Sequence, residues 1–175
     1  GRMPVDCYQQ IIEGFKGVEL VDITSDFLQL RVGKSAWERQ QIRSAFELAD
    51  FAYDAMKSMV KPGVSEIEIA AAGEFAVRSR GASGFGFSTI VGSGLRSNAV
   101  VPTASSKTLQ GGELVMIGIA PKVNGYAGVV GDALPVDGIY TPIQKEFINH
   151  LKEAFRVTKA QLLPRKSGKE IDAPA

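Results

Sequence analysis

Apolar residues recur every three or four positions in several stretches of the chain, a pattern typical of helices with one face toward a core. Each stretch opens with Ser or Thr followed three positions later by Glu or Gln, a reciprocal pair that caps a helix N-terminus. The four capping residues are Ser35, Ser65, Thr141 and Ser167. The pattern therefore predicts a helix after each of them.

The first predicted helix ends at the Lys-Pro-Gly of residues 61–63, and the second runs to about Arg80. The apolar stripe of the first helix is expected to face the core and comprises Ile42, Phe46, Ala49, Tyr53, Met56 and Val60. The third helix has Pro142 in its first position, where a missing N–H costs nothing, and Pro164 closes it. Its apolar face comprises Ile143, Phe147, Leu151 and Phe155.

The helix starts at Ser65 and Ser167 resemble each other. Each serine is preceded by a proline three positions earlier, Pro62 or Pro164, and followed by a glutamate three positions later. We interpret this as an internal duplication whose second half is cut off after the last helix begins. Coincidence of common capping chemistry is the alternative.

Between the second and third helices the pattern changes to that of strands. One strand is predicted at residues 85–91, followed by a polar loop that ends in Gly-Gly. A hairpin follows, with strands at residues 114–120 and 126–136 and the strong turn signal Asn124-Gly125 between them. The expected fold class is α+β, with an antiparallel sheet covered by helices.

The first 33 residues differ from the rest. They predict a short helix at residues 4–15, a strand at 18–23 and a further helical turn at 25–30. We expect this segment to be the tail of a separate N-terminal domain with its linker.

Composition excludes several function classes. The 175 residues carry 20 Lys and Arg against 19 Asp and Glu, so the net charge of +1 gives no basic field for nucleic acid or an anionic membrane. No run of about 18 apolar residues predicts a membrane span, and the N-terminus has no apolar signal-peptide segment. Cys7 is the single cysteine, so no intrachain disulfide can form and a cytoplasmic location is expected.

Familiar catalytic patterns are missing from the sequence. There is no Ser/His/Asp set, no Cys/His metal spacing and no P-loop. His150, the lone histidine, falls beside the apolar face of the third predicted helix and is interpreted as a solvated or packed helix residue. Cys7 is interpreted as an ordinary helix residue.

Four segments, in this order, resemble the pita-bread family of creatinase, prolidase, aminopeptidase P and methionine aminopeptidase. They are "LVDITSDFLQLRVGKSAWERQQIRSA", "VKPGVSEIEIAA", "IVGSGLRSNAVVP" and "GGELVMIGIAPKVNGYAGVVGDALPVDG". The resemblance implies that residues 1–33 are the tail of an N-terminal creatinase-like domain. Residues 34–175 would be the first half of a pita-bread domain. The second half would carry one His and two Glu ligands.

The resemblance also implies where a dinuclear metal site would lie. The family's two hairpin aspartates fall at Gly118 and Val129, its arginine at Asp132, and its loop histidine at or near Val101. Neither glycine nor valine offers a donor atom to a cation. Asp132 is expected to face away from Val129, because strand side chains alternate and three positions separate the two.

We therefore expect no catalytic residue, no metal ligand and no cofactor in this segment. The expected substrate-binding residues are Phe87, Val101, Gly118 and Val129. Mn or Co would be expected only if the register were wrong.

Three functions remain open at this point, and so does the question of whether the protein is an enzyme. The first is a family relative without the dinuclear metal, which binds a peptide or small molecule and in one version hydrolyses a C–N bond without metal. The second is a non-catalytic interaction scaffold, and the third an active Xaa-Pro metallopeptidase. A homodimer is expected, because half a domain would expose apolar surface.

Overall fold

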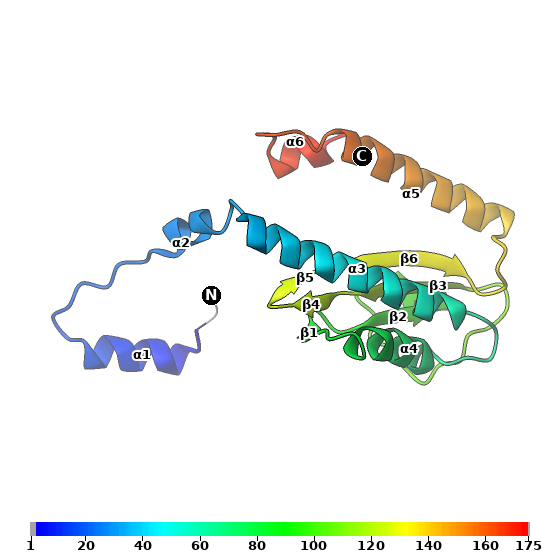
Figure 1. The fold of residues 1–175 in the computed structure, drawn as a ribbon, viewed down its shortest axis with the longest axis horizontal. Coiled ribbons are helices and arrows are strands. Elements are labelled where there is room, and N and C mark those ends of the chain that lie inside the picture. Colours follow the sequence, from blue (N-terminus) through cyan, green and yellow to red (C-terminus); the bar gives the residue numbers. More distant parts are fainter. Residues whose placement is uncertain (1–2, 175) are drawn as a thin grey trace. The chain divides into compact units, whose positions relative to one another are not determined.

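A computed structural model describes residues 3–174, which divide into two compact units after Gln40. The first unit contains helices α1 (Val5–Gly14) and α2 (Thr24–Leu30), which confirm the predicted helix and helical turn (Figure 1). The predicted strand at residues 18–23 is wrong. In the described part of the chain these residues pair with no other strand, and a strand is stabilised by the ladder it shares with a neighbour.

The second unit contains most of the secondary structure. Its helices are α3 (Ala36–Ser58), which begins just before the division, α4 (Glu66–Arg78), α5 (Pro142–Ala160), α6 (Gly168–Asp172) and the 3₁₀ helix η1 (Gly94–Asn98). Its strands are β1 (Gly84–Phe85), β2 (Ile90–Ser93), β3 (Leu114–Ile119), β4 (Pro121–Val123), β5 (Tyr126–Ala127) and β6 (Val130–Pro135).

All four predicted helix starts are confirmed. Ser65, Thr141 and Ser167 each form the complete capping box at the N-termini of α4, α5 and α6. Ser35 and Glu38 exchange the same two hydrogen bonds at the start of α3. Capping is read correctly from the sequence because donor and acceptor lie three residues apart.

The strands form two antiparallel three-stranded sheets, in the orders β2-β3-β6 and β1-β4-β5. The predicted strand at 85–91 is therefore wrong as a single element, because it divides into β1 and β2 on different sheets. The predicted hairpin is also divided between the two sheets. Strands β3 and β6 pair in one sheet, and β4 and β5, which lie between them in the sequence, pair in the other. The Asn124-Gly125 turn is confirmed, with φ of 49° and 87°.

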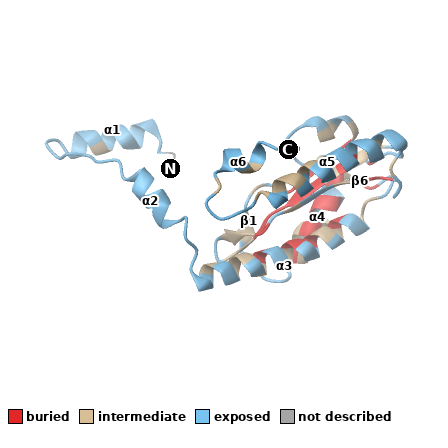
Figure 2. Cartoon of the chain, turned by 90° about the horizontal axis from the view of Figure 1, so that it is seen from above, coloured by how far each residue is buried: buried red, intermediate tan, exposed pale blue. Residues whose placement is uncertain are grey.

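Helices α3 and α4 cover one face of the β2-β3-β6 sheet (Figures 1 and 2). Val115, Ile117 and Ile119 of β3 point into this interface and are at most 2% exposed. The buried face of α3 comprises Ala45, Ala49, Ala52 and Met56, of which Ala52 and Met56 share the core cluster with these β3 residues. The predicted stripe is confirmed in part: Ala49 and Met56 are buried, and Tyr53 and Val60 pack against the core, but Phe46 is 47% exposed.

Helix α3 lies very close to Gly128, which is in the link between β5 and β6. A Cβ placed there would lie 2.3 Å from the backbone N of Phe46 and 2.4 Å from the carbonyl carbon of Ala45. No side chain fits at that distance, so the link passes directly over the backbone of α3.

Helix α5 is amphipathic, but its predicted apolar face lies in solvent. Ile143, Phe147, Leu151 and Phe155 are 49–81% exposed, whereas Ile148 is buried. No helix within residues 3–174 is both long and apolar enough to cross a membrane.

Candidate functional site

The face of the β2-β3-β6 sheet opposite α3 and α4 carries a shallow hollow. Side chains alternate along β3, so Met116 and Gly118 point away from the core that Ile117 enters. Gly118 is paired with Gly131 of β6, and Met116 with Ala133. The small residues at three of these four positions leave a hollow of about 250 Å³.

Three of the four expected substrate-binding residues meet in this hollow. Phe87, Gly118 and Val129 all line it, although they come from the β1–β2 link, from β3 and from the β5–β6 link. Val101 does not line it; this residue follows η1 and is 57% exposed. Met116 also lines the hollow and was missed, although its position two residues before Gly118 could have indicated it.

The hollow is lined mostly by apolar residues, and Asp132 is its one charged lining residue. Gly118 and Val129 offer no donor atom, and the side chains around them are those of Phe87, Ile90 and Met116. Within residues 3–174, no group of three or more His, Cys, Asp and Glu side chains is placed to hold a metal ion. A Cβ at Gly118 would lie 3.5 Å from the side chain of Ile90, an ordinary contact, so there is room for a Cβ at this position.

Asp132 borders the hollow, but its carboxylate points the other way. It is paired with Ile117, whose side chain enters the core, and its Oδ2 accepts a hydrogen bond of 2.7 Å from the Tyr53 hydroxyl of α3. The expectation that Asp132 faces away from Val129 is confirmed.

A second, wider hollow adjoins the first and shares Phe87 with it. It encloses about 530 Å³ and is lined by Ala70, Glu74, Phe85, Phe87, Ser88, Thr89, Thr103 and Ala104. Its polar feature is the hydrogen bond of 2.6 Å that the Thr89 hydroxyl donates to Glu74. Helical periodicity gave no signal for Glu74, because only the tertiary packing brings α4 beside this loop.

A buried carboxylate holds the loops around these hollows. Glu66, at the start of α4, has no solvent exposure and accepts hydrogen bonds from the backbone N–H and hydroxyl groups of both Ser93 and Ser105. Arg96 adds an ion pair of 3.0 Å. Burial by itself would raise the pKa of Glu66, but the hydrogen bonds from Ser105 and Ser93 outweigh it and lower this pKa. One side chain therefore fixes the end of β2 and the loop that follows η1.

The other residues considered from the sequence lie elsewhere. His150 is exposed on α5, and Cys7 is exposed on α1. Neither lines the two hollows described above.

Comparison with known proteins identifies the family. Residues 40–175 match metallopeptidase family M24, which is more than half of the chain. The chain belongs to metallopeptidase family M24. The M24 chain is 34% identical over 155 residues to the uncharacterized peptidase YqhT of Bacillus subtilis, covering 89% of this chain and 44% of that protein. It is 32% identical to the Xaa-Pro dipeptidase of Pyrococcus horikoshii, covering 94% of this chain and 45% of that protein.

Solved structures agree with this assignment. The prolidase of Pyrococcus furiosus superposes with a TM-score of 0.92 at 29% identity, over 99% of this chain and 51% of that chain. The X-Pro aminopeptidase of Thermotoga maritima gives 0.85 at 26% identity, over 98% and 49%. The pita-bread resemblance and the α+β fold class are thereby confirmed. The M24 chain spans about half the length of these relatives.

Proposed function

We propose that this M24 chain binds a peptide or small molecule through the apolar hollow on the open face of the β2-β3-β6 sheet, without a metal pair held by that face. One observation carries the proposal. Phe87, Gly118 and Val129 come together in a hollow whose one lining carboxylate, Asp132, is turned away toward Tyr53. The names of the relatives, Xaa-Pro dipeptidase and prolidase, support a proline-containing peptide as the first ligand to test.

Binding in this hollow would rest on apolar contact. Met116 and Phe87 present flexible and aromatic surface, and the glycines at 118 and 131 let a ligand approach the strand backbone closely. A metal-free C–N hydrolase is the catalytic version of this proposal. Its acid or base would have to come from groups outside the hollow.

The test uses the intact protein and an Xaa-Pro dipeptide. We expect calorimetry to detect dipeptide binding, and we expect no cleavage after addition of Mn²⁺ or Co²⁺. Gly118→Val would fill the hollow and abolish binding. Gly84→Val is the matched control, because a Cβ at Gly84 meets nothing within 4 Å. Two bound equivalents of Mn²⁺ with dipeptide cleavage would overturn the proposal and support the active metallopeptidase.

An interaction scaffold is the second candidate, and the exposed apolar face of α5 favours it. This candidate includes the proposed homodimer. Sedimentation of the intact protein across a range of concentrations tests it: monomers throughout would count against self-association. Replacing Phe147, which is 57% exposed, by Asp should weaken association if α5 mediates it.

We also propose that residues 34–175 correspond to the first half of a pita-bread domain and residues 1–33 to the tail of the domain before it. The match to about half of each relative supports this. The cytoplasmic location is likewise proposed, and the single cysteine supports it.

A further inference from the structure

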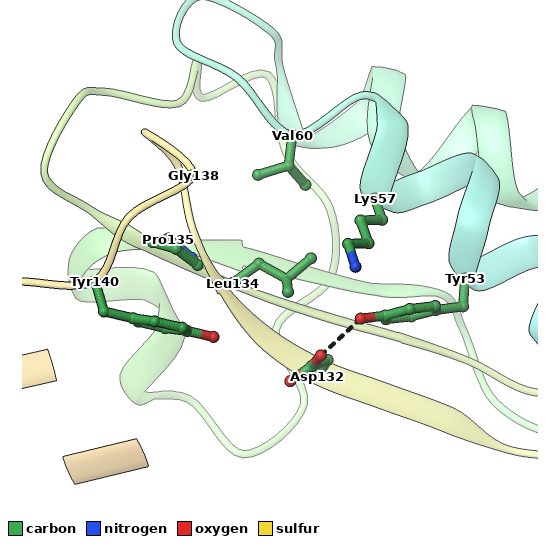
Figure 3. Close-up of a pocket in the computed structure, with 8 residues that line it drawn as sticks. All are labelled: Tyr53, Lys57, Val60, Asp132, Leu134, Pro135, Gly138 and Tyr140. Atoms are coloured by element: carbon green, nitrogen blue, oxygen red, sulfur yellow. Dashed lines mark hydrogen bonds between the residues drawn. The ribbon is translucent and has the colours of Figure 1, made fainter. Parts of the chain in front are cut away.

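A separate hollow lies on the opposite side of the sheet, between the C-terminal part of α3, strand β6 and the turn that leads to α5. It encloses about 370 Å³ and is lined by Tyr53, Lys57, Val60, Asp132, Leu134, Pro135, Gly138 and Tyr140. Figure 3 shows Tyr53 and Lys57 on one side, Tyr140 on the other, and Asp132 and Leu134 of β6 between them. The volume falls within the range of about 300–1,000 Å³ that is typical of small-molecule sites.

This hollow is distinct from the apolar one. Its carboxylate is that of Asp132, which lies on the α3 side of the sheet with Ile117. The apolar hollow is built on the other face, around Gly118 and Gly131. Asp132 lines both hollows, but its carboxylate is turned toward Tyr53 on the α3 side.

The carboxylate of Asp132 is oriented and still has capacity to bind. Its Oδ2 accepts the Tyr53 hydroxyl at 2.7 Å, and its Oδ1 accepts the backbone N–H of Ala133 at 2.8 Å. Each oxygen keeps a further lone pair for a donor from a ligand. Tyr140 is held in turn by the hydrogen bond of 2.8 Å that its hydroxyl donates to the carbonyl of Ala133.

Both phenols stay neutral donors beside this charge. Burial, together with the hydrogen bond to Asp132 and its charge, raises the pKa of Tyr53 to about 12. Burial and the same carboxylate raise the pKa of Tyr140. The tyrosine rings therefore present aromatic surface next to a single negative charge.

Lys57 brings a positive charge to the same hollow. Its Nζ lies 5.5 Å from the centroid of the Tyr53 ring and points toward the hollow in Figure 3. The salt bridges found in the described part of the chain do not include Lys57 or Asp132. The two opposite charges thus face one space without pairing with each other.

We propose that this hollow binds a small zwitterion of the free α-amino acid class. Its ammonium group would donate to Asp132, its carboxylate would meet Lys57, and its side chain would lie on Leu134 and the tyrosine rings. Charge-assisted hydrogen bonds and contact of an ammonium with aromatic faces are among the stronger polar interactions in proteins. A simple anion would be opposed by Asp132, and a simple cation by Lys57.

The test measures binding of L-leucine to the intact protein by NMR chemical-shift titration. Leucinamide lacks the carboxylate and N-acetyl-leucine lacks the ammonium, so each should bind at least about tenfold more weakly than leucine. Asp132→Asn and Lys57→Met should each weaken leucine binding by a similar factor. Asp50→Asn and Lys152→Met make the same charge changes at exposed positions and should leave binding unchanged.

Two outcomes would overturn the proposal. One is no saturable shift at leucine concentrations of roughly 10 mM, well above a millimolar Kd. The other is equal binding of leucine and N-acetyl-leucine. Because Lys57 is exposed, Lys57→Met keeps the test valid even if Asp132→Asn unfolds the protein. Gly118→Val should leave leucine binding unchanged. The amino-acid proposal can therefore fail independently of the proposal that the apolar hollow binds a peptide.

Discussion

Replacing Glu66 by Gln tests whether one buried carboxylate holds the loops around the candidate site. The glutamine has nearly the same size, but its NH₂ group cannot accept a hydrogen bond. Glu66 Oε1 accepts from the backbone N–H and hydroxyl of Ser93, and Oε2 from the same groups of Ser105. Whichever oxygen is replaced, a backbone N–H of one serine loses its acceptor.

The magnitude follows from the lost partners. A buried donor left without an acceptor costs about 1–3 kcal/mol, and breaking a buried ion pair about 3–5 kcal/mol. Arg96 is 40% exposed and can regain water, so we expect Glu66→Gln to lower the free energy of unfolding by about 2–4 kcal/mol. Urea denaturation measures this value. Glu146→Gln, on the exposed surface of α5, is the control and should leave the midpoint unchanged.

The same variant should change the response to acid. Hydrogen bonding lowers the pKa of Glu66 in the folded protein, so its charged form stabilises the fold above the ordinary value of 4.5. This contribution is lost as the pH falls through the lowered pKa. The stability difference between the wild type and Glu66→Gln should therefore shrink below about pH 4.5. Equal stability of the two proteins at pH 7 would refute the reasoning.

Further predictions concern packing, titration and capping. Gly128→Ala should destabilise the protein by about 2 kcal/mol or more, because its Cβ would meet the backbone of α3, whereas Gly84→Ala should not; thermal unfolding of both decides this. Alkaline absorbance titration should show that Tyr53→Phe removes a tyrosine that ionises only near pH 12; a loss near pH 10 would contradict the hydrogen bond to Asp132. Since the neutral phenol is the stabilising form, its contribution should disappear as the pH rises from 10 through 12. Thr141→Ala removes a capping hydrogen bond and should lower the free energy of unfolding, measured by urea denaturation, by about 1 kcal/mol. An unchanged midpoint would show that the N-terminus of α5 frays in the wild type.

Local features of this protein were predicted correctly where their cause is local. The capping boxes at Ser65 and Ser167 and the turn at Asn124-Gly125 involve residues at most three positions apart. The resemblance to the family singled out Gly118 and Val129, and both line the same hollow. The strand expected at residues 18–23 does not form. Strand formation depends on a neighbouring strand, which the local pattern does not reveal.

Tertiary structure alone decided the rest. The sequence determined that α3 has an apolar face, but only the packing of α3 against the rest of the chain decided that Ala45 and Ala52 are buried while Phe46 is not. The sequence also determined that Asp132 points away from Val129. It did not indicate that Tyr53, 79 positions away, is the hydrogen-bond partner of Asp132. Hydrogen bonds and hollows of this kind depend on the distances between packed elements, which periodicity along a chain does not contain.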